Sequence, residues 1–247
     1  MAVDRASGLS LDIDALEIRF PGLTEPALAI EMFHLSAGDH LAVTGASGSG
    51  KSTLINAITG LEPIRTGRIV WDETQFSTLS SFRRDAFRAR HIGLVMQDFH
   101  LFPGLSAVAN VLLPARLSRV VKPVRRERAL ELLETVGIAR PDQHIETLSR
   151  GEMQRVAIAR ALFSAPRVII ADEPTASLDQ KTGAEIAALL VELASRQGAT
   201  LIAVTHDPQL MQRLRRRVFL EGGRITRDDV QEGPQGGTTQ GAGEGMR

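Results

Sequence analysis

The chain contains 247 residues, of which 29 are Lys or Arg and 29 are Asp or Glu, so its formal net charge is zero. Hydrophobic residues supply 43% of the sequence and charged residues 23%, which excludes an intrinsically disordered or fibrous protein. The charge balance argues against binding nucleic acid through bulk positive charge, so we expect no nucleic-acid partner. The sequence contains no Cys, which excludes a disulfide framework, a thiolate zinc site and a cysteine nucleophile.

Hydropathy gives no sign of a membrane span. No run of the sequence approaches the roughly 18 consecutive apolar residues that a transmembrane helix needs. The N-terminal sequence MAVDRASGLSLDID lacks the apolar segment of a secretory signal peptide. We therefore expect any association with a membrane to be peripheral.

Strand patterns recur along the chain. Residues 9–30 alternate in hydropathy as antiparallel strands do, which predicts a small N-terminal β subdomain. Farther along, short apolar runs rich in Val, Ile and Leu predict strands that are buried on both faces of a parallel sheet. These runs are Leu41–Thr44, Ile92–Met96, Val168–Ala171 and Leu201–Val204.

Helical patterns lie between these strands. Apolar residues recur at helical spacing over Ala129–Val136 and over Ile186–Leu193. Such alternation predicts an α/β fold with a mainly parallel sheet. The stretch from about residue 106 to residue 165 carries helical patterns without a convincing strand, which predicts an inserted helical subdomain over about residues 98–165. We expect one domain over residues 1–232 and a disordered, Gly-rich tail over residues 233–247.

A glycine-rich motif follows the predicted strand Leu41–Thr44. Its sequence, GASGSGKST, matches G-x-x-x-x-G-K-[ST] and is followed by a helical pattern over Leu54–Leu61. The glycines allow successive N–H groups to point at phosphate oxygens, and the helix N-terminus adds its positive dipole end. We expect Lys51 to contact the β- and γ-phosphates and the Ser52 hydroxyl to ligate Mg²⁺. The predicted nucleotide-binding residues here are Gly45, Ala46, Ser47, Gly48, Ser49, Gly50, Lys51, Ser52 and Thr53.

Two acidic residues follow the predicted strand Val168–Ala171. Asp172 can hold Mg²⁺ through water, and Glu173 can orient or deprotonate an attacking water molecule. Together with the glycine-rich motif, the pair predicts a P-loop NTPase core. The two motifs do not choose among kinases, GTPases, helicases and transport ATPases, which share them.

The segment LSRGEMQR at Leu148–Arg155 resembles the signature region of ABC-type ATPases. Four further stretches resemble motifs of that family in the same order, and the resemblance covers about residues 9–226. They are Phe20 at the position of the adenine-stacking aromatic, Gln97 in a Q-loop, Ser177-Leu178-Asp179 as a D-loop, and His206 as the switch histidine. The P-loop, the segment MQDFHLF and the end of the signature helix are most similar to ATPases of lipoprotein release or macrolide export.

The resemblance implies a set of site residues. It implies Glu173 as the general base, assisted by His206, with Ser52, Gln97 and Asp172 serving Mg²⁺. Phe20, Gln97, Ser149, Gly151 and Asp179 join the P-loop as nucleotide-binding residues. Ser149 is also a good helix N-cap. In the family, the helix that it begins points at the γ-phosphate bound by the other protomer.

Arg150 departs from the family pattern, which usually has Gly at this position. We expect its side chain to point outward, because an anion site at a helix N-terminus works through backbone amides and needs no side-chain cation. The alternative is that its guanidinium reaches the phosphate or an acidic residue of the partner protomer.

The resemblance implies an ATPase: the ATP-binding subunit of an ABC transporter, with ATP and Mg²⁺ as its cofactors. It further implies a homodimer in the ATP-bound state and a separate integral membrane permease, at the cytoplasmic face of the inner membrane. The cleft around Gln97 and the helical subdomain is expected to receive the permease. Two alternatives stay open. A soluble ABC-type ATPase acting on ribosomes or DNA usually carries two cassettes or a long coiled coil, and a regulatory binder would lack catalytic side chains.

Overall fold

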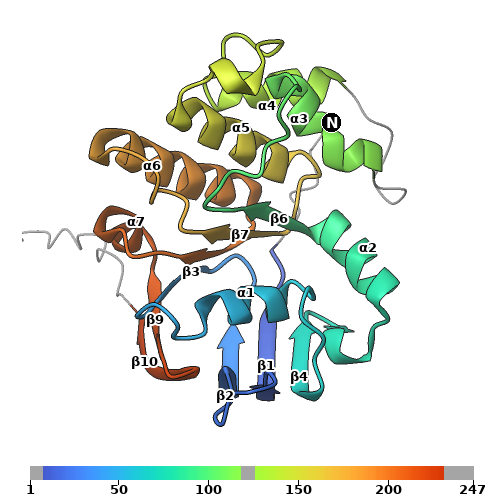
Figure 1. The fold of residues 1–247 in the computed structure, drawn as a ribbon, viewed down its shortest axis with the longest axis vertical. Coiled ribbons are helices and arrows are strands. Elements are labelled where there is room, and N and C mark those ends of the chain that lie inside the picture. The colour runs from blue at the N-terminus through green and yellow to red at the C-terminus, as the bar shows by residue number, and fades with distance from the viewer. Residues whose placement is uncertain (1–7, 118–125, 231–247) are drawn as a thin grey trace, which may run out of the picture.

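The computed structural model describes residues 8–117 and 126–230, which form two β-sheets with helices around them (Figure 1). The first sheet is antiparallel, and its strands run in the order β2 (Leu28–Leu35), β1 (Leu11–Ile18), β4 (Thr66–Trp71) and β5 (Thr74–Gln75). The second runs in the order β10 (Arg224–Val230), β9 (Arg216–Glu221), β3 (His40–Thr44), β8 (Thr200–Val204), β7 (Val168–Asp172) and β6 (Ile92–Val95).

The second sheet is parallel except at one edge. Strands β9, β3, β8, β7 and β6 pair in parallel, and only β10 joins β9 in antiparallel. The described α-helices are α1 (Lys51–Ile58), α2 (Ser81–His91), α3 (Ala107–Leu117), α4 (Arg126–Thr135), α5 (Arg150–Leu162), α6 (Gln180–Gln197) and α7 (Pro208–Arg213). This arrangement confirms the predicted α/β P-loop core with an antiparallel N-terminal sheet and an inserted group of helices.

The parallel sheet separates two hydrophobic cores. On β7, Ile169 and Ala171 join the core that α3, α4, α5 and α6 cover, whereas Val168 and Ile170 join the core beneath the antiparallel sheet and α1. Strand β8 alternates in the same way between the two cores. Because both faces are buried, these strands read in the sequence as unbroken apolar runs.

Three α-helices, α3, α4 and α5, lie between β6 and β7 in the sequence. In Figure 1 they gather at the end of the molecule opposite β1, β2 and β4. The apolar stripe of α4, with Ala129, Leu132 and Leu133, is buried against this group. In the described part of this insertion, the only β-pairing is an isolated bridge between Ser106 and His144. The predicted tail, residues 233–247, lies outside the described residues.

The sequence reasoning missed half of the antiparallel sheet. It placed this sheet within residues 9–30, yet β4 and β5 come after α1. Strand β4 lacks a clear alternation, since its first three residues are exposed and Gly67 adopts a φ of 84° opposite the bulge at Ala15. Helix α2 was missed too; it is rich in Arg, and none of its residues is fully buried.

Trp71 joins β4 to α1 in the core beneath the antiparallel sheet. It is the only tryptophan of the chain, and it is completely buried. Its indole Nε1–H donates a hydrogen bond of 2.8 Å to the carbonyl oxygen of Ile58, the last residue of α1. Strand β4 thereby holds the end of the helix that follows the glycine-rich loop.

We predict that Trp71→Phe lowers the free energy of unfolding by about 1–3 kcal/mol, because it leaves the buried Ile58 carbonyl without its donor and opens a small void. Urea unfolding followed by far-ultraviolet circular dichroism measures the change. Phe82→Leu on α2 is the control, because Phe82 is 76% exposed and its replacement is expected to cost no more than about 0.5 kcal/mol. Equal stability of the Trp71→Phe variant and the wild type would contradict this role.

Candidate active site

The carboxyl ends of β3, β8 and β7 are neighbours at one edge of the parallel sheet, where ligands bind in open α/β sheets. A cavity of about 370 Å³ opens at this edge, a size typical of small-molecule sites. It is lined by Ala27, Ser47, Gly48, Gly50, Lys51, Ser52, Thr53, Gln97, Asp172, Glu173 and His206. The structure thus brings together residues that the sequence scatters over 180 positions from residue 27 to residue 206.

Close backbone approaches fix the shape of the glycine-rich loop. A Cβ on Gly45 would lie 2.1 Å from the carbonyl oxygen of Leu220, and one on Gly50 would lie 2.7 Å from the carbonyl oxygen of Ala27. Gly50 also adopts a φ of 103° immediately before α1. Only glycine fits such positions without displacing the neighbouring backbone. Ala27 lines the cavity, but no sequence signal marked it.

The loop is fastened from behind by the turn between β9 and β10. The N–H of Gly223 donates 3.0 Å to the carbonyl oxygen of Ser49, while Ala29 N–H donates 2.7 Å to the carbonyl oxygen of Gly223. Ser49 itself is buried and does not line the cavity. Gly45 and Ala46 do not line it either. These three predicted residues belong to the loop without lining the cavity.

Lys51 is the first residue of α1. Its ammonium Nζ donates to the carbonyl oxygens of Gly45 at 2.5 Å and Ala46 at 2.9 Å. The charge is consequently held across the loop, at the edge of the cavity. Asp172, the last residue of β7, lines the same cavity. Burial raises the pKa of the Asp172 carboxyl above its usual range, and the positive charge of Lys51 opposes that rise.

Glu173 and His206 lie beside each other in the cavity. Glu173 Oε1 is 3.6 Å from His206 Nε2, and Glu173 Oε2 accepts the backbone N–H of His206 at 3.3 Å. The Glu173 N–H donates 2.8 Å to the Val204 carbonyl oxygen, which ties this residue to the end of β8. Glu173 adopts a φ of 45°, a strained conformation for a residue other than glycine that is typical of functional sites.

Besides Gly45, Ala46 and Ser49, four predicted site residues do not line this cavity: Phe20, Ser149, Gly151 and Asp179. Phe20 is 37% exposed, two residues beyond β1. Asp179 lines an adjoining cavity of about 250 Å³ that also contains Glu173 and His206. Ser149 and Gly151 lie at the start of α5. Ser149 and Gly151, which the resemblance assigns to the γ-phosphate bound by the other protomer, thus lie outside the cavity of their own chain.

Two helix N-caps account for the local roles of these residues. Ser149 caps α5 in a capping box, in which its N–H and hydroxyl each donate 2.8 Å to Glu152 Oε2. These bonds lower the pKa of the Glu152 carboxyl, the backbone bond most strongly. Asp179 caps α6 by accepting the N–H groups of Lys181 and Thr182. The predicted N-cap role of Ser149 is therefore present in the chain.

Gly151 is constrained by its neighbour on α6. A Cβ there would lie 2.6 Å from the Thr182 Cγ2 methyl group. The Arg150 side chain beside it is exposed but lies against its own chain. Its Nε donates 3.0 Å to the carbonyl oxygen of Ser177, and its guanidinium lies over the Phe99 ring. The sequence did not predict these contacts of Arg150 within its own chain.

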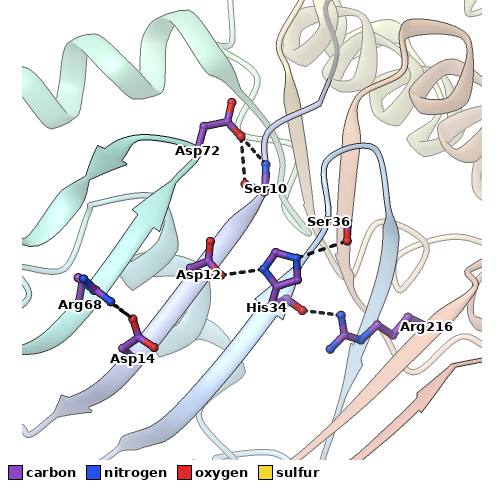
Figure 2. Close-up of polar contacts among 8 residues, drawn as sticks. All are labelled: Ser10, Asp12, Asp14, His34, Ser36, Arg68, Asp72 and Arg216. Carbon is purple, nitrogen blue, oxygen red and sulfur yellow. Dashed lines mark hydrogen bonds and ion pairs between the residues drawn. The ribbon is translucent and has the colours of Figure 1, made fainter.

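A second polar group lies on the antiparallel sheet (Figure 2). His34 Nδ1 is 2.7 Å from Asp12 Oδ1, and His34 Nε2 is 3.4 Å from the Ser36 hydroxyl. The order of contacts is that of a serine hydrolase triad. However, the imidazole is 57% exposed, and Ser36 is exposed as well. Asp12 and His34 are cross-strand partners of β1 and β2, which explains their contact.

Comparison with known proteins identifies the family. The sequence profile described as "ABC transporter" matches residues 31–176. The uncharacterised ABC transporter ATP-binding protein YvrO of Bacillus subtilis is 44% identical, over 79% of this chain and 85% of that protein. The lipoprotein-releasing system ATP-binding protein LolD of Syntrophotalea carbinolica is 42% identical, over 78% and 85%. The macrolide export ATP-binding/permease protein MacB of Chromobacterium violaceum is 40% identical, and the match covers 90% of this chain but 35% of MacB.

Solved structures agree with these relatives. The dimeric post-hydrolysis state of the ATP-binding cassette MJ0796 bound to ADP and Pi superposes with a TM-score of 0.81 at 34% identity, over 90% of this chain and 99% of that one. CbiO1 of Clostridium perfringens superposes with a TM-score of 0.79 at 31% identity, over 89% of this chain and 88% of that one. With the order of the motifs, the cavity and these similarities in agreement, the chain belongs to the ABC transporter family, as one of its ATP-binding cassettes.

Proposed function

We propose that the cavity at the carboxyl ends of β3, β8 and β7 is where this ABC ATPase binds and hydrolyses MgATP. The observation that carries the proposal is the convergence of Lys51, Asp172, Glu173 and His206 on one cavity. A cation, two carboxylates and an imidazole at the mouth of a glycine-rich loop are the groups that phosphoryl transfer to water requires. Catalysis is then mainly positioning and stabilisation of charge on the transferred phosphoryl group.

The phosphates are held by the glycine-rich loop. The N–H groups of the loop and the N-terminus of α1 bind the phosphate oxygens, as the sequence predicts for Gly45 to Thr53. Lys51 exchanges its bonds with the loop carbonyls for bonds with the β- and γ-phosphates. Phe20, exposed beyond β1, offers its ring face to the adenine.

The donors beside the loop fit Mg²⁺. A hydroxyl, an amide and a carboxylate, from Ser52, Gln97 and Asp172, line the same cavity, and hard oxygen donors are what Mg²⁺ prefers. When bound, Mg²⁺ neutralises charge on the phosphate oxygens. Burial raises the pKa of the Asp172 carboxyl and the Lys51 charge opposes that rise, so Lys51 favours the ionised carboxylate that Mg²⁺ needs.

Glu173 is the general base in this proposal. Its carboxylate takes a proton from the water that attacks the γ-phosphorus, while the bond from that phosphorus to the β–γ bridging oxygen breaks. His206, 3.6 Å from Glu173 Oε1, orients the carboxylate and the γ-phosphate. The backbone bonds of Glu173 to Val204 and of His206 to Glu173 keep the two side chains together.

A second copy of the chain completes the site. Ser149, Gly151 and Asp179 lie outside the cavity of their own chain, so we assign them to the γ-phosphate of the partner protomer and to the dimer interface. The similar cassette MJ0796 is described as dimeric with ADP and Pi. ATP-driven homodimer formation follows, because each nucleotide is held between two protomers.

A membrane permease is the other partner. Within residues 8–117 and 126–230, no helix is long and apolar enough to cross a membrane. A groove of about 400 Å³ lies between α2, β6, α3 and α5, with lining from Arg88, Met96, Pro114 and Phe163. We assign this groove to a cytoplasmic segment of the permease, and we propose that the chain lies at the cytoplasmic face of the inner membrane. In this proposal residues 1–232 are the cassette, residues 98–165 its helical subdomain and residues 233–247 a separate tail.

The two alternatives are less well supported. An ATPase of ribosomes or DNA is disfavoured by the zero net charge, and the relatives named above include LolD and MacB. A regulatory binder with an inactive site is disfavoured because the predicted catalytic side chains share one cavity. Co-fractionation with a membrane permease and a phosphate-release assay test the first and second alternatives, respectively.

We predict that Lys51→Ala weakens MgATP binding about 10- to 150-fold, because it removes the charge-assisted bonds of the ammonium to the phosphates. Isothermal titration calorimetry measures the dissociation constant. Arg68→Ala is the matched control, since Arg68 lies on β4 in an exposed ion pair with Asp14. Unchanged affinity in the Lys51→Ala variant would refute the assignment of the loop.

We predict that Glu173→Gln retains MgATP binding but slows phosphate release by about 10²- to 10⁴-fold, because an amide cannot accept the proton of the attacking water. The ATP-bound homodimer is then expected to accumulate, which a sizing column run with MgATP detects. Glu192→Gln on α6, in an exposed ion pair with Arg196, is the control. A monomeric Glu173→Gln variant with wild-type turnover would contradict the role of Glu173 as the base.

A further inference from the structure

Arg150 touches two loops that are distant in the sequence. Its Nε donates 3.0 Å to the carbonyl oxygen of Ser177, and its Cζ lies 5.4 Å from the centroid of the Phe99 ring. Ser177 belongs to the loop that follows β7, whereas Phe99 belongs to the loop that follows β6. The same guanidinium, at the first residue of α5, therefore bridges both loops.

The loop that follows β6 needs support from outside. Phe99 and His100 both adopt left-handed conformations, with φ values of 57° and 46°, which are uncommon for such residues. Arg160, near the end of α5, donates to the carbonyl oxygens of both residues. Arg150 adds a contact on the ring of Phe99. Gln97, two residues before Phe99, lines the candidate active site.

The loop that follows β7 is also attached to α5. Gln154 is fully buried, and its Nε2 donates 2.7 Å to the carbonyl oxygen of Pro174. Gln154 lies four residues, or about one helical turn, after Arg150 on the same helix, and Arg150 holds the same loop at Ser177. This loop begins at Glu173, which lines the candidate active site. Helix α5 thus fixes the backbone segments that directly follow Gln97 and Glu173 in the sequence.

We propose that Arg150 is a positioning residue for ATP hydrolysis, which holds the loops of Gln97 and Glu173 in a fixed mutual arrangement without touching the nucleotide. The proposal rests on the proposed function. Glycine, the usual residue of the family at this position, can make neither contact. Lysine keeps the charge but lacks the planar group that both donates to a carbonyl and stacks on a ring.

The expected kinetic effect is on turnover. Arg150 is exposed, so its two contacts are individually modest, and we expect Arg150→Met to lower kcat about tenfold, equivalent to about 1.4 kcal/mol in the barrier. The KM for ATP and the MgATP dissociation constant are expected to stay within about twofold, because the glycine-rich loop is unchanged. Arg150→Lys is expected to fall between the wild type and Arg150→Met. Arg196→Met, on the exposed side of α6, is the matched control.

Amide hydrogen exchange tests the loops without any nucleotide. We expect faster exchange in peptides covering residues 96–102 and 173–179 of the Arg150→Met variant than in the wild type and in Arg196→Met. This measurement does not depend on hydrolysis. Absence of phosphate release from the wild type would refute the proposed function, whereas the exchange result would still test the bridge.

The proposal requires both results. Unchanged exchange in both loops would show that Arg150 does not hold them, whatever its effect on turnover. Faster exchange with wild-type kcat would show that the bridge has no role in hydrolysis. A raised KM with unchanged kcat would also overturn the proposal, since it would place the guanidinium on the nucleotide itself.

Discussion

Burial of the parallel sheet on both faces is the constraint on which the site depends. Successive residues of β7 and β8 enter opposite cores, so a shift of either strand by one residue would exchange the contents of the two cores. The register of β3, β8 and β7 is therefore fixed. Because the three strands end at the same edge, the glycine-rich loop, Asp172 and His206 meet there.

Helix α5 connects the helical part of the chain to this edge. Its capping box satisfies the N-terminal backbone locally, and Gly151 is small enough for α6 to approach at Thr182. Its long polar side chains then donate to carbonyl groups of three other segments: Arg150 to Ser177 and Gln154 to Pro174 in the loop after β7, Arg155 to Val136 after α4, and Arg160 to Phe99 and His100 after β6. Because these polar side chains interrupt its faces, α5 has no continuous apolar stripe, although seven of its residues are buried.

The sequence predicted the parts whose cause is local. The buried strands, the glycine-rich loop and the acidic pair after β7 each follow from consecutive residues, and the structure places them as predicted. The parts that it missed depend on distant partners. Ala27, the residue before β2, lines the cavity because its backbone lies against Gly50, and Arg150 is oriented by two loops. One missed element had a local signal, since the dipeptide Gly222-Gly223 is typical of the hairpin turn between β9 and β10.

The position of β3 in the sheet has a consequence for synthesis of the chain on the ribosome. Strand β3, which carries the glycine-rich loop, lies between β8 and β9, and the loop is fastened from behind by Gly223. A nascent chain that ends before residue 200 lacks both neighbours of β3 and the fastening turn. The phosphate cradle is therefore encoded early but assembled late, after contacts that span more than 150 residues along the chain have formed. Such non-local pairing slows folding and leaves apolar strands unpaired in the meantime.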